Sequence, residues 1–143
     1  MTVSRTVALL SSAALVTSAA LVTTGPAAAA EADTVVITCV GTSVVKPKQI
    51  VITCADGGVS VVRISWSTWT PNRATGTGTL AWNTCLPEDC ASGIVQKYKA
   101  RIRLGRVASG PGVTAFTRMT LTFPQGGPAA AETATYTIDN PQS

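Results

Sequence analysis

Alternation of apolar and polar residues dominates the chain from about residue 35 onward. Ile94 to Leu104 alternates almost strictly, and Val113 to Phe123 repeats the pattern. Because successive side chains of a strand point to opposite faces of a sheet, alternation predicts strands with one buried face. No window of a dozen residues carries helical apolar spacing with caps, so we expect little or no helix. Further strands are predicted at residues 36–39, 50–54, 59–69, 79–84 and 133–138.

Turn chemistry between these segments favours antiparallel pairing. Asp56-Gly57-Gly58 supplies residues that adopt positive φ, which a tight hairpin needs. Ser109-Gly110-Pro111-Gly112 forms a second turn signal. Short strands at this spacing are typical of a sandwich or small barrel. We therefore expect a small all-β domain, an antiparallel β-sandwich or barrel, with its core at about 35–123, a loose segment at 125–131 and a C-terminal strand at 133–138.

The first 30 residues read as a secretory signal peptide. Arg5 gives a positive start, Val7 to Val22 is an uncharged and mostly apolar run, and Ala28 to Ala30 offers an A-x-A cleavage site. The run is shorter than the roughly 20 residues of a membrane-spanning helix. We therefore expect residues 31–143 to be a single secreted, extracellular domain with no stable membrane insertion after the signal is cleaved.

The chain contains four cysteines and no histidine. In a short exported chain, an even number of cysteines predicts a disulfide framework. The tetrapeptide VITC occurs twice, ending at Cys39 and Cys54, and two such strands folding back around Pro47 would bring these cysteines together. Cys85 and Cys90 would then close a short loop. The spacings match no common zinc pattern, so the sequence predicts two disulfides that staple the domain, no metal and no cofactor.

Four cations line one face of the predicted strand at 94–104. With a period of two, Tyr98 and Ile102 face the core, while the candidate anion-binding residues on the other face are Lys97, Lys99, Arg101 and Arg103. A solvated face, or a charged edge that discourages aggregation, would explain the cations without a ligand. The functional interpretation is attachment to an anionic polymer of the cell envelope. No nucleic-acid partner is expected, since no aromatics interleave with the cations as on a base-stacking platform.

The tryptophans suggest a second candidate surface. Trp66 and Trp69 are three residues apart, so they should point to opposite faces unless a bulge intervenes. We expect Trp66 to pack in the core with Val62 and Ile64, on the same face of the strand. Trp69 and Trp82 remain as a candidate aromatic surface for carbohydrate.

Enzymatic chemistry finds little support in the sequence. The absence of histidine excludes Ser-His-Asp and Cys-His sites. A glycosidase needs two carboxylates facing across a cleft, whereas the acids here lie near the chain ends, in a turn or beside a loose segment. Glu88 and Asp89 are neighbours in the short cysteine loop, and adjacency in sequence does not make a catalytic pair. We expect no enzyme activity and assign no catalytic residue.

Several short motifs follow one another in a fixed order along the chain. They are Cys39, Pro47, C-A-D-G at 54–57, W-x2-W at 66–69, A-x-G-x-G at 74–78, N-x-C-x-P at 83–87, C-A-x-G at 90–93 and F-T-R at 116–118. This ordered set resembles a family of small secreted actinobacterial proteins with no established function. The resemblance covers about residues 38–123 and implies export and a shared fold, but no binding residues. Two features depart from the family: its last two cysteines are usually closer together, and it often carries histidines after the segment matching Gly93.

The sequence therefore favours a secreted, non-catalytic binding or structural domain of the envelope or extracellular space. Its expected partner is an anionic cell-envelope polymer or a secreted protein. Two alternatives stay open. One is a secreted proteinase inhibitor acting through the loop from Cys85 to Cys90, although four residues closed by one bridge make a tight substrate-like loop. The other is a carbohydrate-binding module that uses Trp69 and Trp82.

Overall fold

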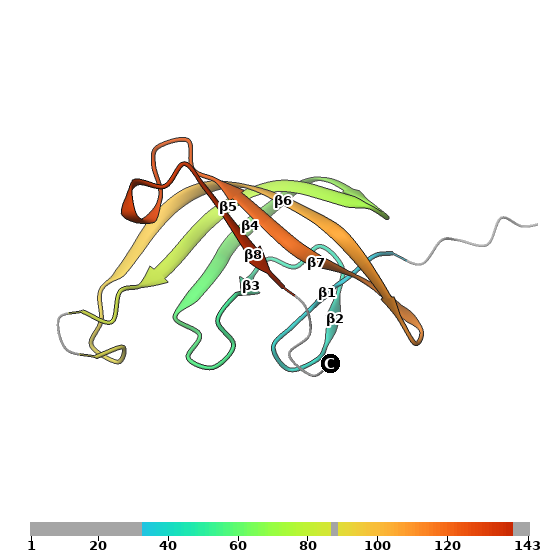
Figure 1. Ribbon diagram of the computed structural model, residues 1–143, viewed down its shortest axis with the longest axis horizontal. Coiled ribbons are helices and arrows are strands. Elements are labelled where there is room, and N and C mark those ends of the chain that lie inside the picture. Colours follow the sequence, from blue (N-terminus) through green and yellow to red (C-terminus); the bar gives the residue numbers. More distant parts are fainter. Residues whose placement is uncertain (1–32, 87–88, 139–143) are drawn as a thin grey trace, which may run out of the picture. The chain divides into compact units, whose positions relative to one another are not determined.

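The computed structural model describes residues 33–86 and 89–138. The expected signal peptide at 1–30 lies outside these residues, as do Glu31, Pro87, Glu88 and Asp139. Six strands form one antiparallel sheet in the order of the sequence, so that each strand pairs with the next (Figure 1). These strands are β3 (Ile50–Val51), β4 (Val59–Thr70), β5 (Arg73–Asn83), β6 (Val95–Gly110), β7 (Val113–Thr122) and β8 (Thr133–Thr137).

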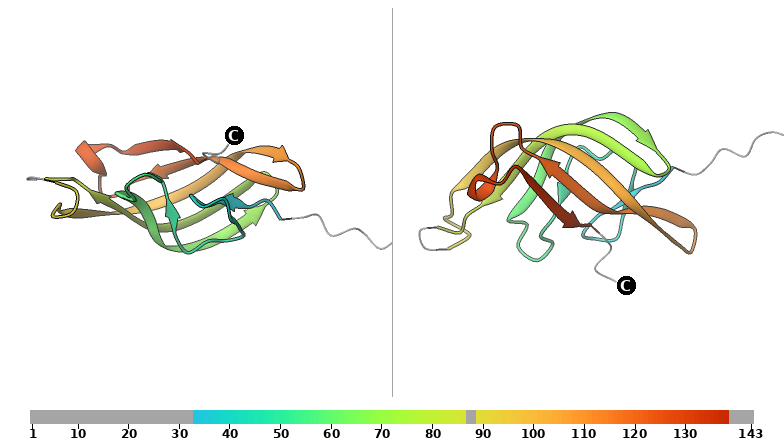
Figure 2. Two further views of the ribbon diagram at one scale, coloured as in Figure 1. Left: turned by 90° about the horizontal axis from the view of Figure 1, so that it is seen from below. Right: turned by 45° about the horizontal axis from the view of Figure 1, so that its top comes forward.

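The six-stranded sheet curls into a half-barrel, which confirms the all-β antiparallel class expected from the alternation (Figures 1 and 2). A second, two-stranded sheet of β1 (Val36–Ile37) and β2 (Ser43–Val44) lies with β3 under the arch of the longer strands. Val35 also bridges to Ala115 of β7. The chain before β4 therefore covers the concave face of the half-barrel.

The concave face carries the core. In β6 the buried residues are Ala100, Ile102 and Leu104, as the alternation predicts. Phe116 and Met119 of β7 are fully buried beside them. The remaining members of the buried apolar cluster, drawn from the sheet and from the segments that cover it, are Val36, Ile50, Val61, Ile64, Ala74, Leu80, Leu121, Phe123 and Ile138.

Both expected disulfides are present, Cys39 to Cys54 and Cys85 to Cys90. The expected pairing of the two VITC strands is wrong, because Val36 of β1 pairs with Val44 of β2, while Ile50 of β3 pairs with Val61 of β4. The cysteines instead meet from the loops that follow β1 and β3.

Contacts with β4 explain this difference. The indole N–H of Trp66 donates to the carbonyl oxygen of Pro47 at 2.8 Å, and the backbone N–H of Ile64 donates to the carbonyl of Lys48 at 3.0 Å. These bonds hold the segment around Pro47 against β4, so it does not act as the turn of a hairpin.

Several strand bounds also differ from the expectation. The Gly/Thr stretch at 75–78 belongs to β5, which begins at Arg73, and β6 extends to Gly110. A Cβ on Gly76 would lie 2.5 Å from the carbonyl oxygen of Ser65, so glycine permits the close approach of the irregular part of β4. The segment at 125–131, expected to be loose, contains a short 3-10 helix at Pro128–Ala130.

Candidate anion-binding face

The cations of β6 stand on the convex face of the sheet, between rows of threonine. Lys97, Lys99, Arg101 and Arg103 are all exposed, and they alternate with residues of the buried core. The register places Arg101 between Thr77 of β5 and Thr122 of β7, and it places Arg103 between Thr75 and Thr120. Lys99 has Thr79 of β5 beside it, whereas Lys97 pairs with Ala81. The convex surface of β6 is therefore a row of positive charges, flanked by hydroxyl groups on both sides at Arg101 and Arg103 and on one side at Lys99. We call these four cations the cationic row.

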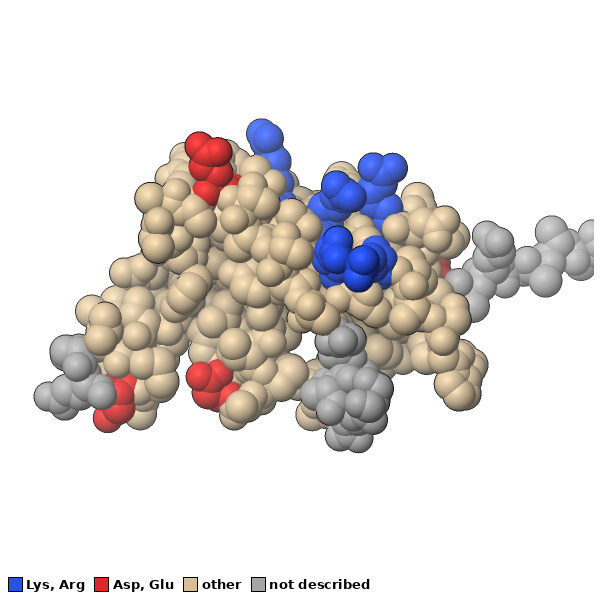
Figure 3. All heavy atoms as spheres, viewed as in Figure 1, with Lys and Arg blue, Asp and Glu red and all other residues tan. Residues whose placement is uncertain are grey.

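No carboxylate lies in the strands that form this face. None of the residues of β4 to β8 is Asp or Glu. Among the residues that the structure describes, the acids nearest to these strands in sequence are Asp56 and Asp89, in turns, and Glu132, directly before β8. In Figure 3, most of the visible Lys and Arg side chains gather in the upper half of the molecule, where one acidic side chain also lies at the upper left, and two further acidic side chains lie at the lower edge. The cationic row thus faces solvent without a carboxylate partner in its own sheet.

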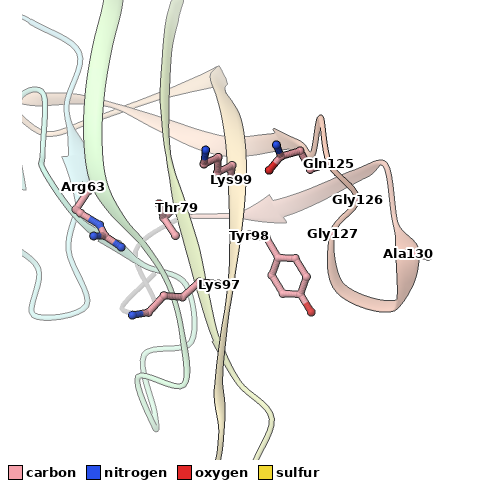
Figure 4. A pocket seen from close by; sticks show the side chains of 9 residues that line it. All are labelled: Arg63, Thr79, Lys97, Tyr98, Lys99, Gln125, Gly126, Gly127 and Ala130. Carbon is pink, nitrogen blue, oxygen red and sulfur yellow. The ribbon is translucent and has the colours of Figure 1, made fainter.

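Arg63 of β4 joins the row across the sheet. A cavity of about 560 Å³ opens between β4 and the segment after β7, and its floor carries Thr79, Lys97 and Lys99. Arg63 stands on one side of it and Gln125 on the other, and Figure 4 shows the Arg63 side chain directed toward Thr79, with the Lys97 side chain extending below both. A second, adjoining cavity shares Arg63, Thr79 and Lys99 and continues toward Arg101. The two cavities together form a trough along the first half of the cationic row.

The backbone at Arg63 has the left-handed conformation. Its φ is +53°, and the register of β4 against β5 shifts between Val62 and Ser65, as at a β-bulge. A non-glycine residue in this region costs roughly 1–2 kcal/mol. Bulges re-aim side chains, and here the bulge leaves Arg63 exposed while Val61 and Ile64 on either side of it are buried.

Sequence reasoning did not find Arg63 or the trough. A signal for the bulge exists in the sequence, because Val61, Val62 and Ile64 cannot all share one face of a regular strand. The expectation that Val62 lies on the same face as Ile64 is wrong for this reason: Val61 and Ile64 are the buried pair, at 0% and 2% exposure.

The tryptophans belong to the core side of the sheet. A second register shift in β4, between Trp66 and Thr68, is the bulge that the sequence argument allowed for, and it turns both Trp66 and Trp69 to one face. Their ring centroids are 4.8 Å apart in an edge-to-face arrangement. Trp69 also packs edge-on against Phe116 at 5.4 Å, and its indole N–H donates to the carbonyl of Thr34 at 2.9 Å.

Trp82 lies far from Trp69 on the same side of the sheet. Trp69 pairs with Ala74 at one end of β5, and Trp82 is near the other end, about 26 Å along the strand at 3.3 Å per residue. Both rings are partly buried and pack against the core cluster. The structure therefore does not bring the two residues of the candidate aromatic surface together.

The acids near the turns have structural partners. The backbone N–H of Gly58 donates to the Asp56 carboxylate at 3.0 Å, and this bond lowers the pKa of Asp56. The backbone N–H and hydroxyl of Ser92 both donate to the Asp89 carboxylate at 2.8 Å, which lowers the pKa of Asp89 in the same way. Each carboxylate is thus held in its charged form as an acceptor for its own turn.

The disulfide loop at Cys85 is fixed by Asn83. The Asn83 side chain accepts from the backbone N–H of Cys85 at 3.0 Å and donates to the carbonyl of Cys90 at 2.7 Å. Leu86 and Ile94 beside the loop are 61% and 62% exposed. Residues 87–88 lie outside the described residues, so the tip of the candidate inhibitor loop has no described geometry.

Neither the comparisons with known proteins nor the placement of metal-ligating residues points to a specific function. No protein-family model matches the chain, and no curated protein and no solved structure matches it either. Between residues 33 and 138, apart from 87–88, no three His, Cys, Asp or Glu residues lie together as a metal site requires. The same part of the chain has no helix long and apolar enough to cross a membrane. The two disulfides are typical of an oxidising, extracellular environment.

Proposed function

We propose that this chain is a secreted, non-catalytic binding domain that attaches to an anionic polymer of the cell envelope through the cationic row of β6. The observation that carries the proposal is the row itself. Its four exposed cations lie on one face of β6, and neither β6 nor the strands beside it contain a carboxylate. Arg101 and Arg103 lie in register between threonines of β5 and β7, and Lys99 lies beside Thr79 of β5. A solvated face needs no such segregation of charge, whereas an uncompensated positive row attracts polyanions.

Secretion and the family resemblance belong to the same proposal. The signal-like segment at 1–30 would direct export, and two disulfides suit a protein that works outside the cytoplasm. The resemblance to small secreted actinobacterial proteins is consistent with a domain that acts on or near an envelope. The inhibitor and carbohydrate-binding alternatives have weaker support, because the first depends on a loop of undescribed geometry and the second on two separated tryptophans.

Co-sedimentation with the cell-envelope fraction of the producing organism tests the proposal. The variant replaces Lys97, Lys99, Arg101 and Arg103 by glutamine, and we expect it to bind at least tenfold more weakly at 50 mM NaCl. Binding of the unchanged domain should fall steeply with salt, because four contacts to a single-stranded polyanion give a log–log slope of about −3.

The matched control removes the same charge from exposed positions outside the cationic row: Lys46→Gln, Lys48→Gln, Arg73→Gln and Arg106→Gln. We expect this control to keep most of the binding. If both variants bind as tightly as the unchanged domain, or if that domain fails to bind at any salt concentration, the cationic row is not an envelope-binding surface.

A further inference from the structure

The spacing of the cationic row restricts the polymer that it can match. Side chains two residues apart on one face of a strand are about 6.7 Å apart along the strand. The four cations from Lys97 to Arg103 therefore repeat at about this interval over about 20 Å. A polymer that places one negative charge every 6–7 Å could meet each cation in turn without a change of register.

Resting on the proposed function, we infer that the ligand is an extended polyol-phosphate chain, in which phosphodiester groups link short polyols such as glycerol. From one phosphorus to the next, a glycerol phosphate chain has six bonds. An extended chain advances about 1.2 Å per bond, by analogy with the polypeptide backbone, which gives a charge repeat of about 7 Å. This repeat matches the cationic row. An extended polyglutamate alternates its carboxylates between two faces, so a chain of equal charge presents only half of them to the row.

The flanking side chains fit the neutral parts of such a chain. Four threonines on the neighbouring strands pair directly with cations of the row: Thr77 and Thr79 on β5, and Thr120 and Thr122 on β7. Hydroxyl groups both donate and accept hydrogen bonds, as polyol hydroxyls and phosphate oxygens require. The convex face therefore offers hydroxyl groups beside three of its four charges, within reach of both the polyol and the phosphate groups of the proposed ligand.

The aromatic residues argue against a nucleic acid, whose backbone has a similar phosphate repeat. All three Trp, both Tyr and both Phe belong to the core cluster or pack against it. Of these rings only Tyr98 also lines the cavity. The convex face thus lacks the succession of rings on which bases stack, although stacking is a main contribution to single-strand binding. The same distribution disfavours a sugar ring held on an aromatic platform.

Arg63 gives the row a specific phosphate subsite. Val62, next to Arg63, pairs with Thr79, and Thr79 pairs with Lys99, so these residues form one line across three strands. Strands β4 and β6 are about 10 Å apart at 4.8 Å per step, which long Arg and Lys side chains can bridge around one anion. A guanidinium binds two phosphate oxygens at once, while the lysines supply point charges. The bulge at Arg63 aims it at the trough, where Lys97 and Gln125 complete the lining.

A length series tests the inference by calorimetry at 50 mM NaCl. The probes are oligo(glycerol phosphate) chains with one to six phosphates, oligoglutamates of equal charge, and single-stranded DNA of equal phosphate number. We expect affinity to rise steeply up to four or five phosphates and then flatten, because the row and Arg63 are then filled. The tetraphosphate should bind at least tenfold more tightly than the tetraglutamate.

The variant Arg63→Asn tests the subsite. Asparagine tolerates the left-handed backbone, so we expect the Tm not to fall, while affinity for the glycerol phosphate tetramer drops about fivefold or more. The control Arg73→Asn removes an exposed cation from the β4–β5 turn and should change this affinity less than twofold. Equal loss in both variants would contradict a specific site at Arg63.

The outcomes separate this inference from the function on which it rests. If oligoglutamate binds as tightly as oligo(glycerol phosphate), and both bindings vanish when the cationic row is neutralised, the row binds polyanions but the polyol-phosphate assignment is wrong. Tighter binding of single-stranded DNA would replace the polyol-phosphate with a nucleic acid. If none of the probes binds while the envelope fraction does, the polymer has another chemistry, and if the envelope fraction also fails to bind, both proposals fall.

Discussion

Replacement of Phe116 by alanine is expected to lower the free energy of unfolding by about 3–5 kcal/mol. Phe116 is fully buried on β7, and its ring meets Trp69 of β4 edge-to-face with centroids 5.4 Å apart. The backbone N–H of Phe116 also donates to the carbonyl oxygen of Val35 at 2.9 Å. Val35 bridges to Ala115 of β7 and belongs to the segment that covers the concave face. Truncation of the Phe116 side chain would therefore leave a cavity between β4, β7 and the segment at Val35. Urea unfolding followed by tryptophan fluorescence measures the change.

The control for this prediction is Ile94→Ala. Ile94 is 62% exposed, so its truncation should change the free energy of unfolding by less than about 0.5 kcal/mol. If Phe116→Ala costs no more than Ile94→Ala, the concave face is not the core of the domain.

Loss of the disulfide between Cys39 and Cys54 is expected to lower the free energy of unfolding by about 3 kcal/mol. The bridge closes a loop with a sequence separation of 15, and the cost follows from the chain entropy that the bridge removes from the unfolded state. In the folded protein it ties the loop after β1 to the loop after β3. The double variant Cys39→Ser with Cys54→Ser, compared with the unchanged domain in urea, measures this contribution.

The second disulfide provides an internal comparison. The pair Cys85 and Cys90 has a sequence separation of 5, and the same entropy argument gives about 2 kcal/mol for its removal. Both double variants should retain polyanion binding at temperatures where they are folded, since neither bridge lies on β6. A larger cost for the shorter loop would show that chain entropy does not govern these bridges.

Regular alternation made the central part of the fold predictable. The strand at 94–104 was expected with its apolar positions inward and its cations outward, and in β6 Ala100, Ile102 and Leu104 are buried while the cations are exposed. In this part of β6, successive side chains alternate between the two faces of the sheet, so the period of two in the sequence gives the correct buried and exposed residues. The cysteine pairing was also predicted correctly, although the pairing of the two VITC strands that supported it was wrong.

Bulges and long-range hydrogen bonds set the limit of sequence reasoning. A bulge inserts one residue and reverses the faces of all that follow, and β4 contains two such irregularities within a few residues. They place Trp66 and Trp69 on one face and turn Arg63 outward, which a strict period of two cannot anticipate. The attachment of Pro47 to Trp66 is likewise a contact between segments distant in sequence, and it overrides the local hairpin signal.

The curl of the sheet connects stability with the candidate function. Aromatic and aliphatic residues fill the concave face, so the convex face needs no apolar packing and can carry charge along its whole length. Arg63 departs from the favourable backbone region, and strain of this kind is often found where a side chain must be aimed at a ligand. In this account, the core and the disulfides fix the row of cations, and the row performs the binding.

An amide-resolved NMR titration of residues 31–143 with oligo(glycerol phosphate) of four phosphates tests whether the convex face of β6 binds the polymer. We expect the largest shift changes at residues 97–103 of β6, with further changes at Arg63 and Thr79, and we expect added salt to reverse them. Changes confined to the loop between Cys85 and Cys90, or to the segments around Trp69 and Trp82, would place the binding surface away from the convex face and overturn the proposed function.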